Sequence, residues 1–240
     1  MPKLILLLFI PALLLNVTCY ATEQKVLEQS LHQYYQLNIN INRYWKDDTN
    51  LKNKQSTERT LELMNQAMAE LLNKKYPATE YQEISKNWEK VSKLIDDTSL
   101  IEQGYADVSL IASYRVYLDN VRQAMLKRYQ ENPPTSDIAN SLILFDRIIS
   151  TYVEVNTDAF GSFIRSANDE DMDLTKIAEQ IDENLIVFQQ SNSISKTDLY
   201  AIKIKWKFIR NVITSNNGQA SPFIVLLNGN KIIQILESYY

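Results

Sequence analysis

The sequence predicts an all-α fold, a helical bundle of about eight helices. Only four glycines and six prolines occur in 240 residues, far fewer turn residues than an all-β fold needs. Apolar residues recur with helical spacing in stretches separated by polar segments. One apolar row also occurs twice, because Trp206 lies 118 positions after Trp88 within a similar set of neighbours.

The repeated row predicts two four-helix halves built on a common plan. At the offset of 118, the row of the second half and its counterparts in the first are Leu199 and Tyr81, Ile202 and Ile84, Ile209 and Val91, Val212 and Leu94, and Ile213 and Ile95. This spacing is that of one buried helical face. We therefore expect Trp88 and Trp206 to define the cores of a half over 22–132 and a half over 133–240, joined in one unit. Chance similarity between two amphipathic helices is the alternative.

Residues 1–21 have the pattern of a secretory signal peptide. Lys3 precedes an apolar run over 4–15, and small residues stand at the first and third positions of Cys19-Tyr20-Ala21, so cleavage is expected after Ala21. A lipoprotein acylated at Cys19 is the disfavoured alternative, because Asn16-Val17-Thr18 does not match the residues that usually precede such a cysteine. No later stretch reaches the roughly 20 apolar residues of a membrane-spanning helix.

The composition of the mature chain excludes several kinds of site and partner. Cleavage removes the only cysteine, which excludes disulfides, thiolate catalysis and cysteine metal sites. The remaining 24 basic and 29 acidic residues give a formal charge of −5, which does not favour nucleic-acid binding. An exported, cysteine-free chain rich in Asn, Gln, Lys and Ile is typical of a soluble bacterial periplasmic protein, and this is the expected location.

Four helices are expected in the first half. Apolar periodicity predicts helices over about 23–45, 56–73 and 107–130, and the capping box Thr79-Glu-Tyr-Gln82 opens the helix that carries Trp88. Ser56 is the expected cap of the second helix, after a polar loop over 46–55.

The second half repeats this order. Ser136 or Asp137 is expected to cap its first helix, and further helices are expected over about 173–190, around Trp206, and from Pro222 onward. Residues 202–208, IKIKWKF, alternate strictly between apolar and basic, which by itself is typical of a half-buried strand. We expect a helix, because the run belongs to a longer row with helical spacing.

No motif for catalysis or metal binding stands out, so we expect no enzyme activity, no metal and no cofactor. With His32 as the only histidine, the usual zinc sets are not available, and a role in helix packing or at the surface is expected for it. The acidic run 168–173 has the spacing of a calcium loop, but Leu174 and Gln180 stand where that loop needs glycine and glutamate. These acids are expected to cap the next helix instead.

A basic stripe is the main candidate site. Lys203, Lys207 and Arg210 follow i, i+4 and i+7 on the Trp206 helix, beside the apolar row. Their counterparts at the offset of 118 are Ser85, Glu89 and Ser92. A basic stripe that faces a neutral-to-acidic one could bind an anion or dock a partner, and a solvated face is the alternative.

The paired layout resembles the periplasmic helical domain of type IV pilus methyl-accepting chemotaxis transducers and nitrate-sensor kinases. The similar elements are Asn87-Trp-Glu-Lys-Val91, Lys205-Trp-Lys-Phe-Ile209 and Ser221-Pro-Phe-Ile-Val225, and they span most of the mature chain. The resemblance implies a sensor-like bundle that binds a small anionic ligand. The family's Gly-Arg-Gln-Arg-Met-Leu-Ser-type motif is replaced by Ile39-Asn-Ile-Asn-Arg-Tyr-Trp45, so Arg43 matches the anion-contacting arginine by position only.

We therefore expect a non-enzymatic, sensor-like periplasmic bundle that binds a small anionic ligand or an envelope partner such as a membrane receptor. The alternative is a structural or adaptor module of a pilus, secretion or envelope assembly. A ligand binder should hold a concave, aromatic-lined pocket between its halves. An adaptor should instead expose a sizeable apolar patch.

Export gives the first test. If residues 1–21 are a cleaved signal peptide, N-terminal sequencing of the periplasmic protein should begin at Thr22. A lipid-modified Cys19 at the mature N-terminus would contradict this interpretation.

Overall fold

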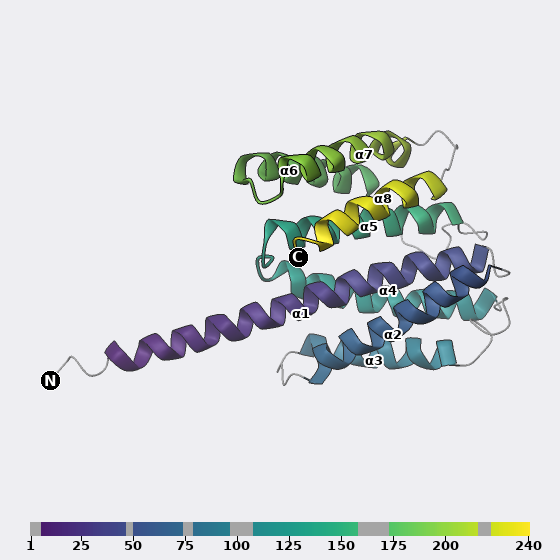
Figure 1. Ribbon diagram of the computed structural model, residues 1–240. Coiled ribbons are helices and arrows are strands. Elements are labelled where there is room, and N and C mark those ends of the chain that lie inside the picture. The colour runs from purple at the N-terminus through teal and green to yellow at the C-terminus, as the bar shows by residue number, and fades with distance from the viewer. Residues whose placement is uncertain (1–5, 47–49, 74–78, 97–107, 158–172, 216–221) are drawn as a thin grey trace.

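The structure, a computed structural model, describes residues 6–46, 50–73, 79–96, 108–157, 173–215 and 222–240, with the side chains of the first helix from Thr22 onward. Within these ranges the chain forms eight α-helices and no strand, which confirms the predicted fold class (Figure 1). The helices are α1 (Leu6–Lys46), α2 (Leu51–Asn73), α3 (Thr79–Asp96), α4 (Val108–Gln130), α5 (Asp137–Thr157), α6 (Leu174–Ser191), α7 (Lys196–Thr214) and α8 (Pro222–Glu237).

Side-chain caps explain where several helices begin. The Ser136 hydroxyl accepts from the backbone N–H of Ala139 at 3.1 Å, at the start of α5. Asp173 caps α6 by accepting from the backbone N–H groups of the second and third helical residues, as expected for the end of the acidic run. The other acids of that run, over 169–171, lie outside the described residues.

The start of α2 differs from the prediction. The helix begins at Leu51 rather than at Ser56, inside the stretch that was expected to be a loop. The Asn50 side chain caps it by accepting from the backbone N–H of Lys52 at 3.1 Å and of Asn53 at 3.4 Å. Asparagine is as good an N-cap as serine, so the earlier of the two caps opens the helix.

Helix α1 runs without a break through the expected cleavage site after Ala21. Its N-terminal part projects beyond the other helices (Figure 1). Thr22 is exposed, and Glu23 and Gln24 are buried. For the residues that the structure describes, no helix combines the length and the apolar character needed to cross a membrane.

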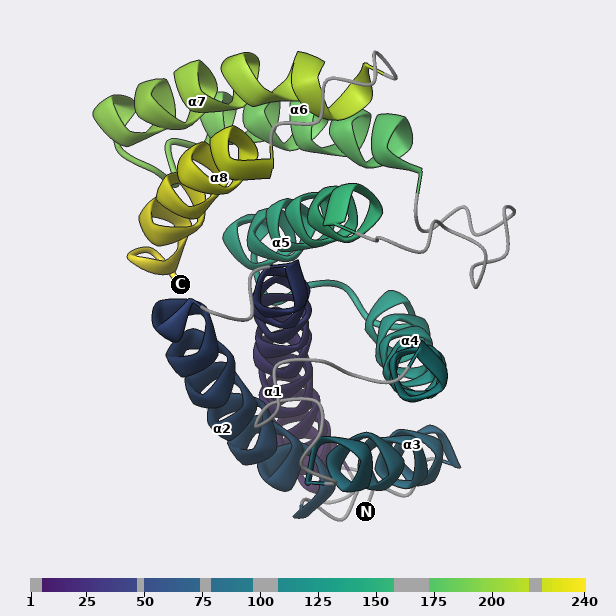
Figure 2. The same ribbon diagram turned by 90° about the vertical axis from the view of Figure 1, so that its right-hand side faces the viewer.

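The helices form two groups of four, each around its own apolar core. In the first group α1 packs on α2 and α4, and α3 packs on α4; in the second, α5 packs on α6 and α8, and α7 packs on α6 and α8. Helices α1 and α5 pack on each other in the middle, and α3 and α7 lie on opposite outer sides (Figures 1 and 2). The last residues of α3 and α7, Asp96 and Thr214, are 118 positions apart, as are those of α2 and α6, Asn73 and Ser191. The internal duplication stays a prediction.

The repeated apolar row is buried in both groups. Trp88 is 6% exposed in α3, and Trp206 is 3% exposed in α7. The Trp206 ring packs edge-on against Phe145 of α5, with 5.4 Å between centroids, and its indole N–H donates to Asp182 of α6 at 2.7 Å. Trp206 therefore joins three helices of the second core.

A layer of polar side chains, the α1–α5 seam, separates the two apolar cores. Asp146 of α5 is fully buried, and its carboxylate accepts from the Gln36 amide at 2.7 Å and pairs with Nδ1 of His32 at 2.6 Å. The other ring nitrogen of His32 lies 3.2 Å from a carboxylate oxygen of Glu237 in α8. His32 thus contributes to helix packing, because it joins α1 to two helices of the other group.

Two further contacts extend the seam along α1. The Asn38 amide donates to Ser150 and Glu154 of α5, each at 2.9 Å. Nearer the start of α1, the Glu28 carboxylate accepts from the backbone N–H and the hydroxyl of Thr135 at 2.7 and 2.5 Å. These directional contacts fix the register of α1 against α5, since sliding either helix would leave buried polar groups unpaired.

The seam holds His32 in its charged form. Burial, the largest single influence, lowers the pKa of His32, but the charge and hydrogen bond of Asp146 and those of Glu237 together raise it from 6.5 to about 10. Its hydrogen bond in turn lowers the pKa of Glu237. At neutral pH an imidazolium therefore lies between two carboxyl groups, one on each adjoining helix.

This charge pair should make stability depend on pH. Because folding raises the pKa of His32, its contribution is complete below pH 6.5 and is lost as the pH rises toward about 10. Urea titrations at these two pH values should show a larger fall in the free energy of unfolding for wild type than for His32→Gln/Asp146→Asn, which keeps polar groups of similar shape without the charges. Equal falls would contradict a charged pair. His32→Gln alone should cost on the order of 3 to 5 kcal/mol, because it leaves a buried carboxylate without its counter-charge.

The two tryptophans give a second stability test. Trp206→Ala and Trp88→Ala should each cost about 3 to 5 kcal/mol, the range for deleting a buried aromatic side chain. Trp206→Phe keeps much of the ring but loses the hydrogen bond to Asp182, and that bond contributes about 1 kcal/mol. Denaturant titration measures all three variants. A loss below about 1 kcal/mol for either alanine variant would contradict a core role.

Candidate functional site

The four predicted site residues do not come together. Lys203, Lys207 and Arg210 lie on α7, which packs on α6 and α8, whereas Arg43 lies on α1, which packs on α2, α4 and α5. The Arg43 guanidinium is half-buried beside Asn40 at 3.5 Å, and burial lowers its pKa. Arg43 and the basic stripe therefore cannot contact one small ligand together.

The basic stripe runs along the contact between α7 and α6. The Lys203 ammonium donates to Gln189 at 2.6 Å, and Arg210 donates to Asp182 at 2.7 Å, on the carboxylate that also accepts from Trp206. Lys207 is exposed. The stripe does not face its first-half counterpart, because α3 and α7 lie on opposite sides with α1 and α5 between them (Figure 2).

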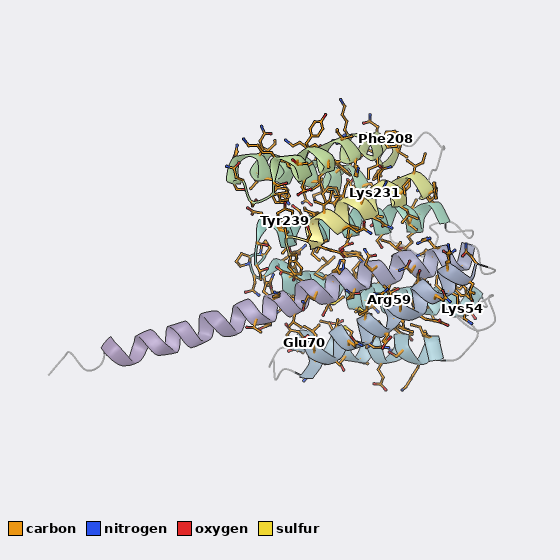
Figure 3. All side chains as sticks on the ribbon, in the orientation of Figure 1. Lys54, Arg59, Glu70, Phe208, Lys231 and Tyr239 are labelled. Atoms are coloured by element: carbon orange, nitrogen blue, oxygen red, sulfur yellow. The ribbon has the colours of Figure 1, made fainter. Side chains whose placement is uncertain are left out.

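The outer face of α7 carries a second apolar row, which the sequence analysis did not single out. Tyr200, Ile204 and Phe208 are 68%, 51% and 59% exposed. They follow i, i+4 and i+8, so they lie next to one another on one side of the helix. We call this row the α7 ridge; Figure 3 labels Phe208 at its C-terminal end.

The equivalent face of α3 is polar. At the offset of 118, the residues that correspond to the α7 ridge are Gln82, Lys86 and Lys90. Lys90 lies over the ring of Tyr117 at 4.4 Å, and Gln82 and Lys86 are exposed. Two helices with the same buried row thus have opposite outer faces. Helix α3 buries a similar apolar row without an apolar outer face, so burying that row does not by itself account for the α7 ridge.

Positive charge surrounds the α7 ridge. Helix α7 contains one acidic residue, Asp198, and five basic ones, Lys196, Lys203, Lys205, Lys207 and Arg210, in a protein whose formal net charge is −4. By the i, i+3 spacing, Lys203 is adjacent to Tyr200 and Lys207 is adjacent to Ile204. The surface around the ridge therefore favours an acidic partner.

The strand-like alternation in 202–208 was the sequence signal of this surface. In the helix, Ile202 and Trp206 are buried, whereas Ile204 and Phe208 are exposed. Two apolar rows on opposite faces of one helix overlap in sequence to give a period of two. The pattern that resembled a strand is thus a helix with a buried and an exposed apolar side.

Further apolar side chains are exposed on the same half. They are Ile186 and Val187 of α6 and Phe223 and Leu227 of α8, the two helices on which α7 packs. Single exposed apolar residues are common on proteins, but a continuous exposed row is typical of an interaction surface. We take the α7 ridge with its flanking lysines as the candidate functional site.

Comparisons with known proteins give no relative from which a function for this site could be inferred. No family model, curated protein or solved structure matches the chain.

Proposed function

We propose that this protein is an exported, non-enzymatic interaction module that docks an envelope protein, such as a membrane receptor, through the α7 ridge. The observation that carries the proposal is the exposed row Tyr200, Ile204 and Phe208 on a helix whose first-half counterpart is polar on the same face. This is the feature that distinguishes an adaptor from a small-ligand binder.

The seam between the halves supports the same choice. A sensor-like ligand binder would hold its pocket there, but His32, Asn38 and Glu28 of α1 all bond to side chains or backbone of the other half. Small-anion binding at the stripe has less support, since Arg210 is paired with Asp182 and Lys203 with Gln189. Export is supported by the pattern of residues 1–21.

The size of the α7 ridge sets the strength of the contact. Fully burying a large apolar side chain contributes about 1.5 to 3 kcal/mol of favourable free energy. Each ridge residue is already partly buried and has between half and two thirds of its surface left to bury. The three residues together therefore contribute roughly 3 to 5 kcal/mol to the free energy of binding. Association costs on the order of 4 kcal/mol or more. The ridge alone therefore supports a transient contact, or one that is reinforced by repetition or by neighbouring charges.

Replacing the ridge tests the function. Tyr200→Gln/Ile204→Gln/Phe208→Gln should fold with wild-type stability, because exposed substitutions usually change it by no more than about 0.5 kcal/mol each. A photo-crosslinking residue placed at position 207 of the otherwise wild-type protein should give a specific covalent adduct in cells. Mass spectrometry then identifies the protein to which it is joined. The triple Gln background should lose that adduct.

A matched control removes exposed apolar side chains elsewhere. Leu51→Gln/Val116→Gln/Val155→Gln changes three side chains that are 66%, 45% and 54% exposed on α2, α4 and α5. This variant should keep the adduct. If the ridge variant keeps it as well, or both variants lose it, the ridge is not the docking surface.

A further inference from the structure

We propose that the protein docked on the α7 ridge is a second copy of this chain, which receives the ridge in a groove on α2. The inference rests on the proposed function of the ridge and adds the identity of the partner. It is drawn from a second surface whose shape and charge complement the first.

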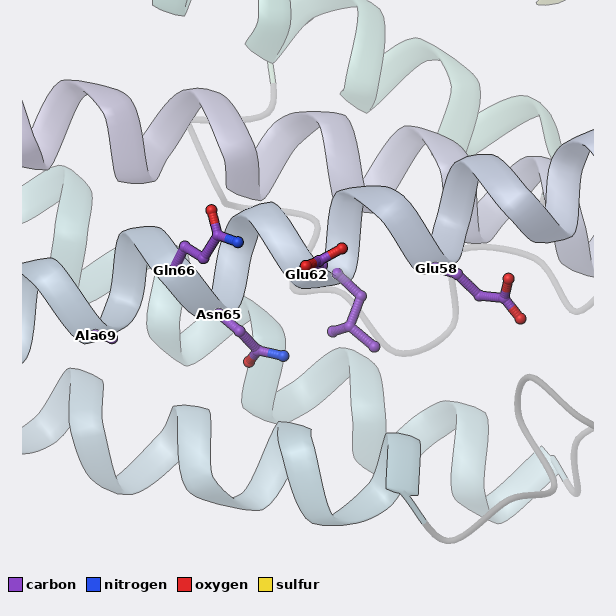
Figure 4. Close-up of a pocket in the computed structure, with 6 residues that line it drawn as sticks. Glu58, Glu62, Asn65, Gln66 and Ala69 are labelled. Carbon is purple, nitrogen blue, oxygen red and sulfur yellow. The ribbon is translucent and has the colours of Figure 1, made fainter.

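The receiving surface is an open depression of about 440 Å³ along α2 (Figure 4). Its described lining residues all come from this one helix: Glu58, Leu61, Glu62, Asn65, Gln66 and Ala69. Helix α3 runs alongside and contacts α2 at only a few residues. The partly buried Leu61 packs against the first core, so the depression has an apolar base.

The lining residues form two parallel rows. Positions 61, 65 and 69 make one row and positions 58, 62 and 66 the other, each with a spacing of four. The α7 ridge, at positions 200, 204 and 208, is also a row with a spacing of four. Rows with a spacing of four on one helix pack between such rows on another, which is the commonest way that helices dock. The ridge spans about 12 Å and the depression about 16 Å, at a rise of 1.5 Å per residue.

The charges match as well as the shapes. Glu58 and Glu62 are exposed and lie one turn apart along the groove, and Lys203 and Lys207 lie one turn apart beside the ridge. Lys54 approaches Glu58 only at 4.0 Å. With the ridge seated against Leu61 and Ala69, Lys207 of one copy can meet Glu58 or Glu62 of the next, and Lys203 can do the same by exchanging its bond to Gln189 for one to a carboxylate. Such pairs steer association and fix its register.

The two surfaces cannot meet within one molecule. Helix α7 belongs to the second group and α2 to the first, with α1 and α5 between the groups (Figures 1 and 2). A contact between different surfaces of identical copies is heterologous, so it builds an open filament or a closed ring rather than a two-fold dimer. Repetition then strengthens a contact that is weak on its own.

An anionic membrane is the other occupant that the lysines would suit. The whole chain carries a net charge of −4, which opposes approach to an anionic surface. A second copy instead offers an acidic groove with rows of matching spacing. The observations therefore favour self-association.

Charge exchange tests the contact. In sedimentation velocity at low salt, the mean sedimentation coefficient of purified wild type should rise with concentration. Lys207→Glu and Glu62→Lys should each associate at least tenfold more weakly, because each places like charges across the contact. A one-to-one mixture of the two variants should associate again, since each then offers only complementary surfaces to the other. Lys52→Glu, an exposed charge change on the first turn of α2 and outside the groove lining, should behave as wild type.

Several results would overturn self-docking. Wild type that stays monomeric at several hundred micromolar, association that the single variants leave unchanged, or a mixture that stays monomeric would each do so. A monomeric wild type that pellets with phosphatidylglycerol vesicles would replace the second copy with a membrane surface. The crosslinking experiment separates the two proposals. If wild type is monomeric but crosslinks in cells to a different protein, and the triple Gln variant of the ridge does not form that adduct, the docking function stands and only the identity of the partner is wrong.

Discussion

A carboxylate with no exposure to water, that of Asp146, is the constraint on which the arrangement of the two halves depends. A buried carboxylate is costly unless hydrogen bonds and a counter-charge compensate it. Asp146 obtains both from α1, through Gln36 and His32, and His32 in turn contacts Glu237 at the end of α8. The position of α1 against α5, and through α8 that of the second group, follows from satisfying this one group.

The polar seam also explains why one long helix serves two apolar cores. Most of the buried apolar residues of α1 belong to the first core, but Ile39 belongs to the second, and Ile143 of α5 belongs to the first. An entirely apolar boundary between α1 and α5 would allow several registers of similar free energy. Directional pairs such as Asn38 with Ser150 and Glu154 exclude the others.

The sequence predicted what depends on local spacing and chemistry. The helical class, the burial of Trp88 and Trp206, and the caps at Ser136 and Asp173 follow from periodicity and side-chain propensity. The seam could not be predicted, because His32 and Asp146 are 114 positions apart and neither lies in a motif. The only sequence signal of the α7 ridge was the strand-like alternation in 202–208. A helix was expected to have one buried apolar face, so a second, exposed apolar row was not predicted.

The same alternation gives α7 a different character when it is not folded. In an extended chain, Ile202, Ile204, Trp206 and Phe208 fall on one side, and Lys203, Lys205 and Lys207 fall on the other. A segment with such an apolar side is prone to stack into cross-β aggregates. Stacked copies would bring three lysines of each chain beside those of the next, and the repulsion between them opposes amyloid-like assembly of the unfolded segment.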